Sequence, residues 1–126
     1  MADAQRAVER YIAAWNESDP ARIAALLDGC VAGGASLMSN QHAVTGRAAL
    51  ADFVAAFRAA RPQDRAVLTS AVETVGRRFR FTGGGIGADG KPYGEVMDVG
   101  ELDGEGRIAW LVTFDAPLPR STSTSS

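Results

Sequence analysis

The sequence predicts an α+β domain, with helices first and then a curved antiparallel sheet that packs the helices on its concave side. Two observations give this class. Apolar residues recur at helical spacing as far as Ala60, whereas from Asp64 onward they alternate as in strands. Two turn signals, Ala88–Lys91 and Asp103–Gly106, then divide the second half of the chain into a meander.

Length and composition indicate one ordinary globular domain. The chain has 126 residues, 46% of them hydrophobic and 22% charged, which suits a single core. We expect this domain to cover residues 1–117 and the polar segment 118–126 to be disordered, because it lacks the apolar content needed for packing. No run is long enough to span a membrane, and the charged N-terminus differs from a signal peptide, so we expect a cytoplasmic protein without a membrane partner.

Charge and ligand-forming residues exclude two classes of function. A net charge of −2 argues against a nucleic-acid partner, since phosphate recognition requires a basic surface. The chain contains one cysteine and one histidine, so no disulfide forms within it and a transition-metal site is not expected. We therefore expect no metal and no cofactor.

Three helices are predicted in the first half. The first covers residues 3–17, where four apolar residues form one stripe: Val8, Tyr11, Ile12 and Trp15. Asp19 is suited to cap a second helix that has Pro20 at its first position and continues to Leu27. The third is predicted over Arg47–Ala60, with a stripe of Leu50, Phe53, Val54 and Phe57. Between the last two helices, residues 30–32 and 35–38 form short β-prone pieces separated by two glycines.

The second half predicts strands whose two faces differ. Two strands are expected between Val67 and Phe81, and the glycines of 83–87 predict a bend or bulge that would also enlarge a cavity. In the strand 94–102 one face carries Val96, Asp98, Gly100 and Leu102. In the last strand, 107–115, one face carries Ile108, Trp110, Val112 and Phe114, and the other carries Ala109, Leu111, Thr113 and Asp115.

Asp98 is the strongest candidate for a functional residue. A carboxylate on an apolar strand face is costly unless it is paired, hydrogen-bonded or protonated, and such residues often mark sites. Burial should raise its pKa, which would suit a hydrogen-bond donor or a general acid. The alternative is structural, with the strand bending so that the carboxylate reaches water or an arginine.

Three segments of the chain resemble the NTF2-like superfamily. They are Tyr11-Ile-Ala-Ala-Trp15 with Asp19 and Leu26-Leu27, then Thr45-Gly-Arg-Ala-Ala-Leu50 with Phe53, and finally Asp103–Asp115. This superfamily includes SnoaL-like polyketide-cyclase-like proteins, ketosteroid isomerases and limonene-epoxide-type hydrolases. The resemblance implies a cone in which a bent, mixed sheet wraps the N-terminal helices around an internal pocket, and a homodimer formed through the outer sheet face.

The resemblance also implies roles for single residues. Tyr11 matches the tyrosine with which ketosteroid isomerases donate a hydrogen bond to the substrate oxyanion, and Asp98 matches their protonated aspartic acid. The position of their catalytic base is Leu37 here, with no carboxylate from there to Thr45. Compared with the epoxide hydrolases, Asp98 and Asp115 look like the two carboxylates.

In the comparison with the epoxide hydrolases, their arginine has no counterpart, because its position is Val96 in this chain.

Further residues complete the candidate site. His42 follows a polar loop cluster and is the first candidate for a base that titrates near neutral pH, unless it is an exposed loop residue. Seven residues are expected to contact a ligand: Trp15, Asn40, Phe53, Phe57, Val96, Leu111 and Thr113.

Two functions remain open on the sequence alone. The first is an enzyme that acts on a small hydrophobic molecule by acid–base catalysis, in which Asp98 moves a proton, Tyr11 stabilises an oxyanion, and His42 or Asp115 supplies the base. The second is a non-catalytic ligand-binding or dimerisation module, with Asp98 anchoring a polar end of the ligand. In either case the apolar strand face that includes Trp110 is expected to be buried in a homodimer.

Overall fold

The computed structural model describes residues 3–118 and 120–121, and it confirms the α+β class. Residues 119 and 122–126 of the predicted disordered tail lie outside the described residues. The elements follow one another in this order: α1 (Asp3–Trp15), α2 (Pro20–Asp28), β1 (Val31–Met38), β2 (Ala43–Thr45), α3 (Arg47–Ala60), β3 (Arg65–Leu68), β4 (Glu73–Val75), β5 (Arg78–Ile86), β6 (Pro92–Leu102) and β7 (Ile108–Asp115).

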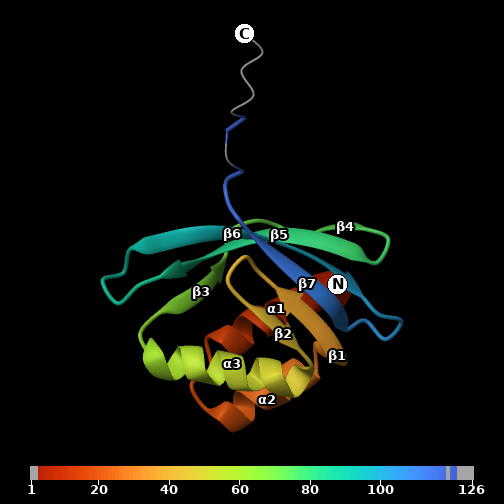
Figure 1. Cartoon of the computed structure of the whole chain (residues 1–126), viewed down its shortest axis with the longest axis horizontal. Coiled ribbons are helices and arrows are strands. Elements are labelled where there is room, and N and C mark those ends of the chain that lie inside the picture. Colours follow the sequence, from red (N-terminus) through yellow and green to blue (C-terminus); the bar gives the residue numbers. More distant parts are fainter. Residues whose placement is uncertain (1–2, 119, 122–126) are drawn as a thin grey trace.

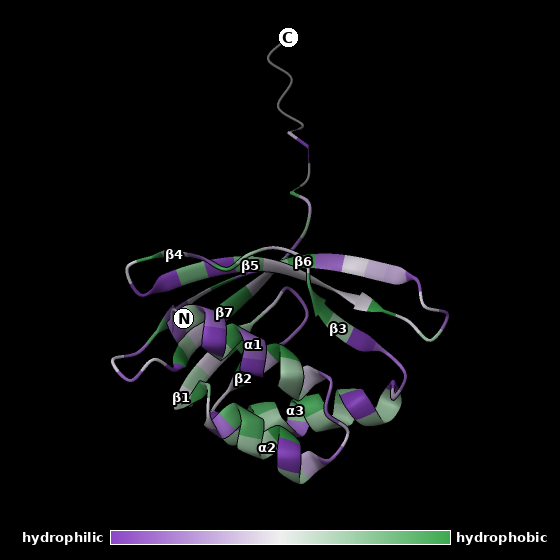
Figure 2. Ribbon diagram, turned by 180° about the vertical axis from the view of Figure 1, so that it is seen from behind, coloured by the Kyte–Doolittle hydropathy of each residue, from purple (hydrophilic) through white to green (hydrophobic). Residues whose placement is uncertain are grey.

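The strands form one curved, mixed sheet that arches over the helices (Figure 1). Its order is β2-β1-β7-β6-β5-β3, and β4 pairs with β5. Only the β1–β7 pairing among these is parallel. The helices lie on the concave side, and along each of them apolar and polar segments alternate, as expected when one face packs on the sheet (Figure 2).

Local signals in the sequence account for the helices. The side chain of Asp19 accepts a hydrogen bond from the Ala21 amide at 3.0 Å, which confirms it as the cap of α2. Helix α3 has the predicted bounds. Helix α1 ends at Trp15, two residues early, and the Asn16 side chain instead bonds both the amide and the carbonyl of Ala66. This clamp ties the end of α1 to strand β3 at the edge of the sheet.

The first strand is longer than the sequence predicted. The pieces 30–32 and 35–38 belong largely to one strand, β1, which runs through Gly33 and Gly34. The pairing of β1 with β7 shifts register between Val31 and Ser36, so an irregularity absorbs the glycines without ending the strand.

A second irregularity, at the start of β7, overturns the predicted face of Ile108 and leaves the faces from Trp110 onward as predicted. Leu102 pairs with Ile108 and Glu101 pairs with Trp110, so Ala109 is an extra residue between them. An extra residue reverses the alternation of side chains. Ile108, predicted on the same face as Trp110, therefore points into the core and is fully buried.

A third irregularity lies near the other end of β6, at Gly94. Gly84 pairs with Glu95 and Gly85 pairs with Tyr93, which leaves Gly94 unpaired with a φ of 60°. Strict alternation would place Tyr93 on the outer face together with Glu95. The bulge turns Tyr93 toward the concave face instead.

Strand β6 approaches its neighbours closely where Gly100 lies against Trp110 and Phe79. A Cβ atom there would lie 2.6 Å from the Trp110 carbonyl oxygen and 2.7 Å from Cζ of Phe79, whereas a Cβ atom at Gly33 would meet nothing within 4 Å. We predict that Gly100→Ala lowers the free energy of unfolding by about 1–3 kcal/mol because of overpacking. Urea denaturation measures this, with Gly33→Ala as the matched strand control. Equal stability of the two variants would contradict the packing.

Candidate functional site

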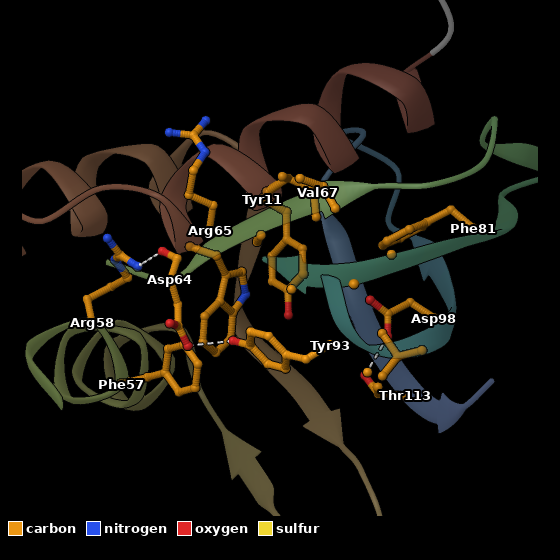
Figure 3. A pocket seen from close by; sticks show the side chains of 18 residues that line it. Tyr11, Phe57, Arg58, Asp64, Arg65, Val67, Phe81, Tyr93, Asp98 and Thr113 are labelled. Atoms are coloured by element: carbon orange, nitrogen blue, oxygen red, sulfur yellow. Dashed lines mark hydrogen bonds between the residues drawn. The ribbon is translucent and has the colours of Figure 1, made fainter. Parts of the chain in front are cut away.

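A cavity of about 320 Å³ lies between the concave face of the sheet and helices α1 and α3 (Figure 3). This volume is at the lower end of the range for pockets that bind small molecules. Its walls are mostly apolar. The residues that line it are Tyr11, Ile12, Trp15, Phe57, Arg58, Asp64, Arg65, Ala66, Val67, Phe81, Gly83, Gly84, Gly85, Tyr93, Gly94, Val96, Asp98 and Thr113.

Glycines on β5 leave room for this cavity. Gly83 and Gly85 follow Phe81 on the inner face of the strand. Larger side chains at these two positions would project into the cavity. A Cβ atom at Gly85 would lie 2.6 Å from Cζ of Tyr93. The phenol ring of Tyr93 therefore rests against bare backbone, and any side chain at Gly85 would displace it.

Asp98 is buried at one end of the cavity, as the alternation of β6 predicted. It is 6% exposed, and the hydroxyl of Thr113, its cross-strand partner on β7, donates to Oδ1 at 2.5 Å. Burial raises the pKa of Asp98 to about 6, and the Thr113 hydrogen bond opposes this rise because it favours the ionised form. No cation is among the groups that shift it.

This environment gives Asp98 two usable states. With a pKa of about 6 the carboxyl is mostly ionised at neutral pH and mostly protonated in mildly acidic solution. A group that titrates close to the working pH is well suited to both accept and return a proton. The expected increase in pKa is present, but at neutral pH the resting form is the base and not the hydrogen-bond donor.

Tyr11 reaches the same space from helix α1. The phenol is 6% exposed, and Figure 3 shows it pointing toward the space beside Asp98. Burial and then the charge of Asp98 raise the pKa of Tyr11, while the Trp15 indole acts against them. The phenol therefore stays protonated, and it is a hydrogen-bond donor.

Aromatic side chains form the wall between α1 and α3. The Trp15 ring meets those of Tyr11, Phe53 and Phe57 edge-on, at centroid distances of 6.3, 6.0 and 5.3 Å. Trp15 and Phe57 line the cavity, as does Val96 on β6. Phe53 lies behind Trp15 and outside the lining.

Several predicted site residues are not in the lining. His42 is exposed, and its ring packs on Phe53 at a centroid distance of 5.0 Å. Asp115 has the inward register but is exposed at the end of β7, where its Oδ2 accepts a hydrogen bond from the Asn40 amide at 3.5 Å. Leu111 is a core residue, 1% exposed. Of the predicted polar residues, the fold gathers Tyr11, Asp98 and Thr113 around the cavity.

A second polar group lies at the opposite end of the cavity and was not predicted from the sequence. It is here called the mouth cluster and consists of Arg58, Arg61, Asp64 and Tyr93. The Asp64 Oδ2 atom accepts from the Tyr93 hydroxyl and from Nε of Arg61, both at 2.6 Å. Helical periodicity could have predicted that Arg58 is buried, since it continues the buried stripe of α3. Tyr93 was hidden by the bulge at Gly94.

The described part of the chain contains neither a metal-binding cluster nor a membrane-spanning helix. Within residues 3–118 and 120–121, no three His, Cys, Asp or Glu side chains are arranged to hold a metal ion. The helices over the same residues are too short or too polar to cross a bilayer.

Comparison with known proteins gives a family and a set of similar folds. A model of the SnoaL-like domain matches residues 8–111. The chain is similar to a proposed isomerase of the SnoaL-like family from Agrobacterium tumefaciens, with 29% identity and a TM-score of 0.85 over 93% of this chain and 100% of that one. A search of curated proteins gives no match.

Two more distant structures share the fold. A proposed polyketide cyclase from Sinorhizobium meliloti is 18% identical, with a TM-score of 0.66 over 85% of this chain and 92% of that one. A cystatin-like fold protein of unknown function from Methylobium petroleophilum is 16% identical, with a TM-score of 0.74 over 98% of this chain and 82% of that one. Identities this low bear on the fold alone.

The raised pKa of Asp98 predicts a pH-dependent change in stability. The ionised form is disfavoured in the folded state, so this penalty is absent below about pH 4 and grows to about 3 kcal/mol above about pH 6. Asp98→Asn, which still accepts from Thr113, should therefore raise the free energy of unfolding near pH 8 and have little effect near pH 4. Urea denaturation at both pH values measures this.

The exposed Asp52→Asn is the control for that experiment, because it changes the net charge by the same amount without altering a buried group. It should leave stability nearly unchanged at both pH values. A stabilisation by Asp98→Asn that is the same at both would contradict the raised pKa.

Proposed function

The chain belongs to the SnoaL-like domain family, and we propose that it binds a small, mostly apolar molecule and moves a proton on it without a cofactor. The observation that supports this is the pairing of Tyr11 and Asp98 at one end of an apolar cavity. One is a donor that stays protonated, and the other titrates at about pH 6. The similarity to a proposed isomerase agrees with it.

In the proposed reaction Asp98 is both base and acid. Its carboxylate takes a proton from a carbon next to a carbonyl, and the electron pair of that C–H bond moves onto the carbonyl oxygen. The Tyr11 hydroxyl donates a hydrogen bond to the resulting enolate. In a substrate with a β,γ carbon–carbon double bond this enolate is a dienolate, and Asp98 then returns the proton to the γ carbon while the double bond moves to the α,β position, which completes an isomerisation. This assignment needs no carboxylate at Leu37.

An epoxide hydrolase is a weaker candidate. In that chemistry one acid protonates the epoxide oxygen while a second polar group activates water. The lining contains Asp98 and, at the far end, Asp64, whose carboxylate is already bonded to Arg61 and Tyr93. Asp115 lies outside the lining, so only Asp98 serves at the Tyr11 end.

The alternative of a different class is a ligand-binding module without catalysis. It is favoured by the placement of His42 and Asp115 outside the lining, which leaves one titratable acid beside Tyr11. In that case Asp98 and Tyr11 only anchor a polar atom of the ligand. Turnover, and not binding, distinguishes the two proposals.

We also propose a homodimer through the outer patch, defined as Met38, Met97, Val99, Trp110, Val112 and Phe114. The sheet register places these residues side by side on the convex face. Met38 and Phe114 are 52% and 51% exposed. Burial against a second copy would remove this apolar surface from water. We propose further that the protein is cytoplasmic and needs no cofactor, as expected from the sequence.

Proton transfer can be tested with simple ketones. We predict that the protein speeds exchange of solvent deuterium into the carbon next to the carbonyl of cyclic ketones such as 2-tetralone, followed by proton NMR. Asp98→Asn should lower the rate about 10²–10⁴-fold, as expected for loss of a general base. Tyr11→Phe should lower it about 10²–10³-fold through loss of an oxyanion donor.

The control is His42→Gln, which changes a titratable group outside the lining and should keep the wild-type rate. Ketones that raise the melting temperature without any exchange would support the non-catalytic module instead. Exchange that survives Asp98→Asn would exclude Asp98 as the base.

The dimer has a separate test. We predict that the wild type sediments as a dimer at micromolar concentration, and that Phe114→Glu or Trp110→Glu converts it to monomers, because each places a charge in a buried apolar contact. Val75→Glu is the control, since Val75 is 74% exposed on β4, outside the patch. A monomeric wild type in analytical ultracentrifugation would refute the interface.

A further inference from the structure

Arg58 is a buried cation that lines the cavity at the end opposite Asp98 (Figure 3). It is 8% exposed and follows Leu50 and Val54 on the buried stripe of α3. An arginine on such a stripe is unusual, because charged side chains are almost never fully buried unless they are paired. The groups that surround Arg58 therefore bear on the kind of ligand that the cavity binds.

The hydrogen-bond partners of Arg58 are all main-chain carbonyls. Nη1 donates to those of Arg61, at 3.3 Å, and Asp64, and Nη2 donates to that of Pro62 at 3.0 Å. Nε has no partner among the described residues. Carbonyls satisfy N–H groups but carry no net charge, so the positive charge has no counter-ion in the part of the chain that the structure describes.

The nearby carboxylate is already engaged. Asp64 is the one acid of the lining at this end, and its Oδ2 bonds Arg61 and Tyr93. The Arg61 guanidinium also stacks over the Tyr93 ring, 5.0 Å from its centroid. Arg65 also borders the cavity, but it is exposed and Figure 3 shows its guanidinium pointing away from Asp64 and Tyr93. The mouth cluster thus carries two positive charges, on Arg58 and Arg61, against one negative charge, on Asp64.

The free donors of Arg58 have a useful geometry. Nε and Nη2 together carry three N–H groups, of which one is bonded, to Pro62. The Nε–H and one Nη2–H lie side by side on one edge of the planar guanidinium. Two parallel N–H groups on one edge match the two oxygens of a carboxylate.

We infer that the ligand is an amphipathic carboxylate, with its anionic group at Arg58 and, at its other end, either a hydroxyl group that bonds Tyr11 and Asp98 or a carbonyl oxygen that bonds Tyr11. This rests on the proposed function for the second contact and extends it to the substrate class. Between the two ends the walls are apolar or aromatic: Ile12, Trp15, Phe57, Val67, Phe81 and Val96. A small aromatic or alicyclic skeleton fits such walls and the modest volume.

The test compares three acids of increasing length with their primary amides: 4-hydroxybenzoate, 4-hydroxycinnamate and 6-hydroxy-2-naphthoate. Calorimetry near pH 8 with the wild type should show at least one acid binding about tenfold or more tightly than its amide, as expected for charge-assisted hydrogen bonds. Added salt should reduce this preference. An acid and amide that bind equally, or no binding of any acid at millimolar concentration, would overturn the inference.

Variants separate the role of Arg58 in binding from its role in holding the loop. Arg58→Gln should remove the preference for acid over amide, and Arg58→Lys should keep part of it, with folding checked by circular dichroism. Arg78→Gln, an exposed arginine on the outer face of β5, is the matched control and should keep the full preference. An intact preference in a folded Arg58→Gln variant would reject Arg58 as the anion site.

Tyr11→Phe distinguishes failure of this inference from failure of the proposed function. It should weaken acid and amide by the same factor, because both carry the hydroxyl that reaches Tyr11 and Asp98. If Tyr11→Phe changes neither affinity while the acid preference persists, the proposed function fails at its own end and the carboxylate site stands. If Tyr11→Phe weakens both but acid and amide bind equally, only the carboxylate site fails.

Discussion

The site depends on where the central strands break their regular alternation of side chains. The bulge at Gly94 turns Tyr93 inward, and the bare backbone of Gly85 gives its ring a place to lie. Gly83 keeps the neighbouring inner position empty. A strand pair with ordinary side chains and strict alternation would fill this space and leave Tyr93 outside. The cavity and one of its ends thus follow from a few backbone positions.

Asp98 shows how the fold sustains a group that weakens it. Its carboxyl is withdrawn from water, and among the described residues it receives one hydrogen bond, from Thr113, and pairs with no cation. The resulting penalty at neutral pH, about 3 kcal/mol, is a sizeable share of a typical domain's stability. Such a group persists where the surrounding core is stable enough to offset it, and functional sites are the usual place for it.

Periodicity predicted the helices and the inward placement of Tyr11 and Asp98, because both lie on regular stretches of α1 and β6. It placed Ile108 on the wrong face and missed Tyr93, because a bulge reverses every side chain beyond it. His42 was assigned on its residue type alone, and residue type does not say where a loop lies. Arg58 could have been found, since a charge on the buried stripe of α3 is itself a signal.

Asp98 and Arg58 lie at opposite ends of the cavity, and this separation affects the chemistry of both. A cation in contact with Asp98 would lower its pKa and fix it as an inert carboxylate. A carboxylate of the protein in contact with Arg58 would neutralise the guanidinium charge and leave none for a ligand. Because the apolar walls keep the two apart, each retains its chemistry, and the ligand class that we infer would contact both. We expect charge to orient such a ligand, with its reacting carbon beside Asp98.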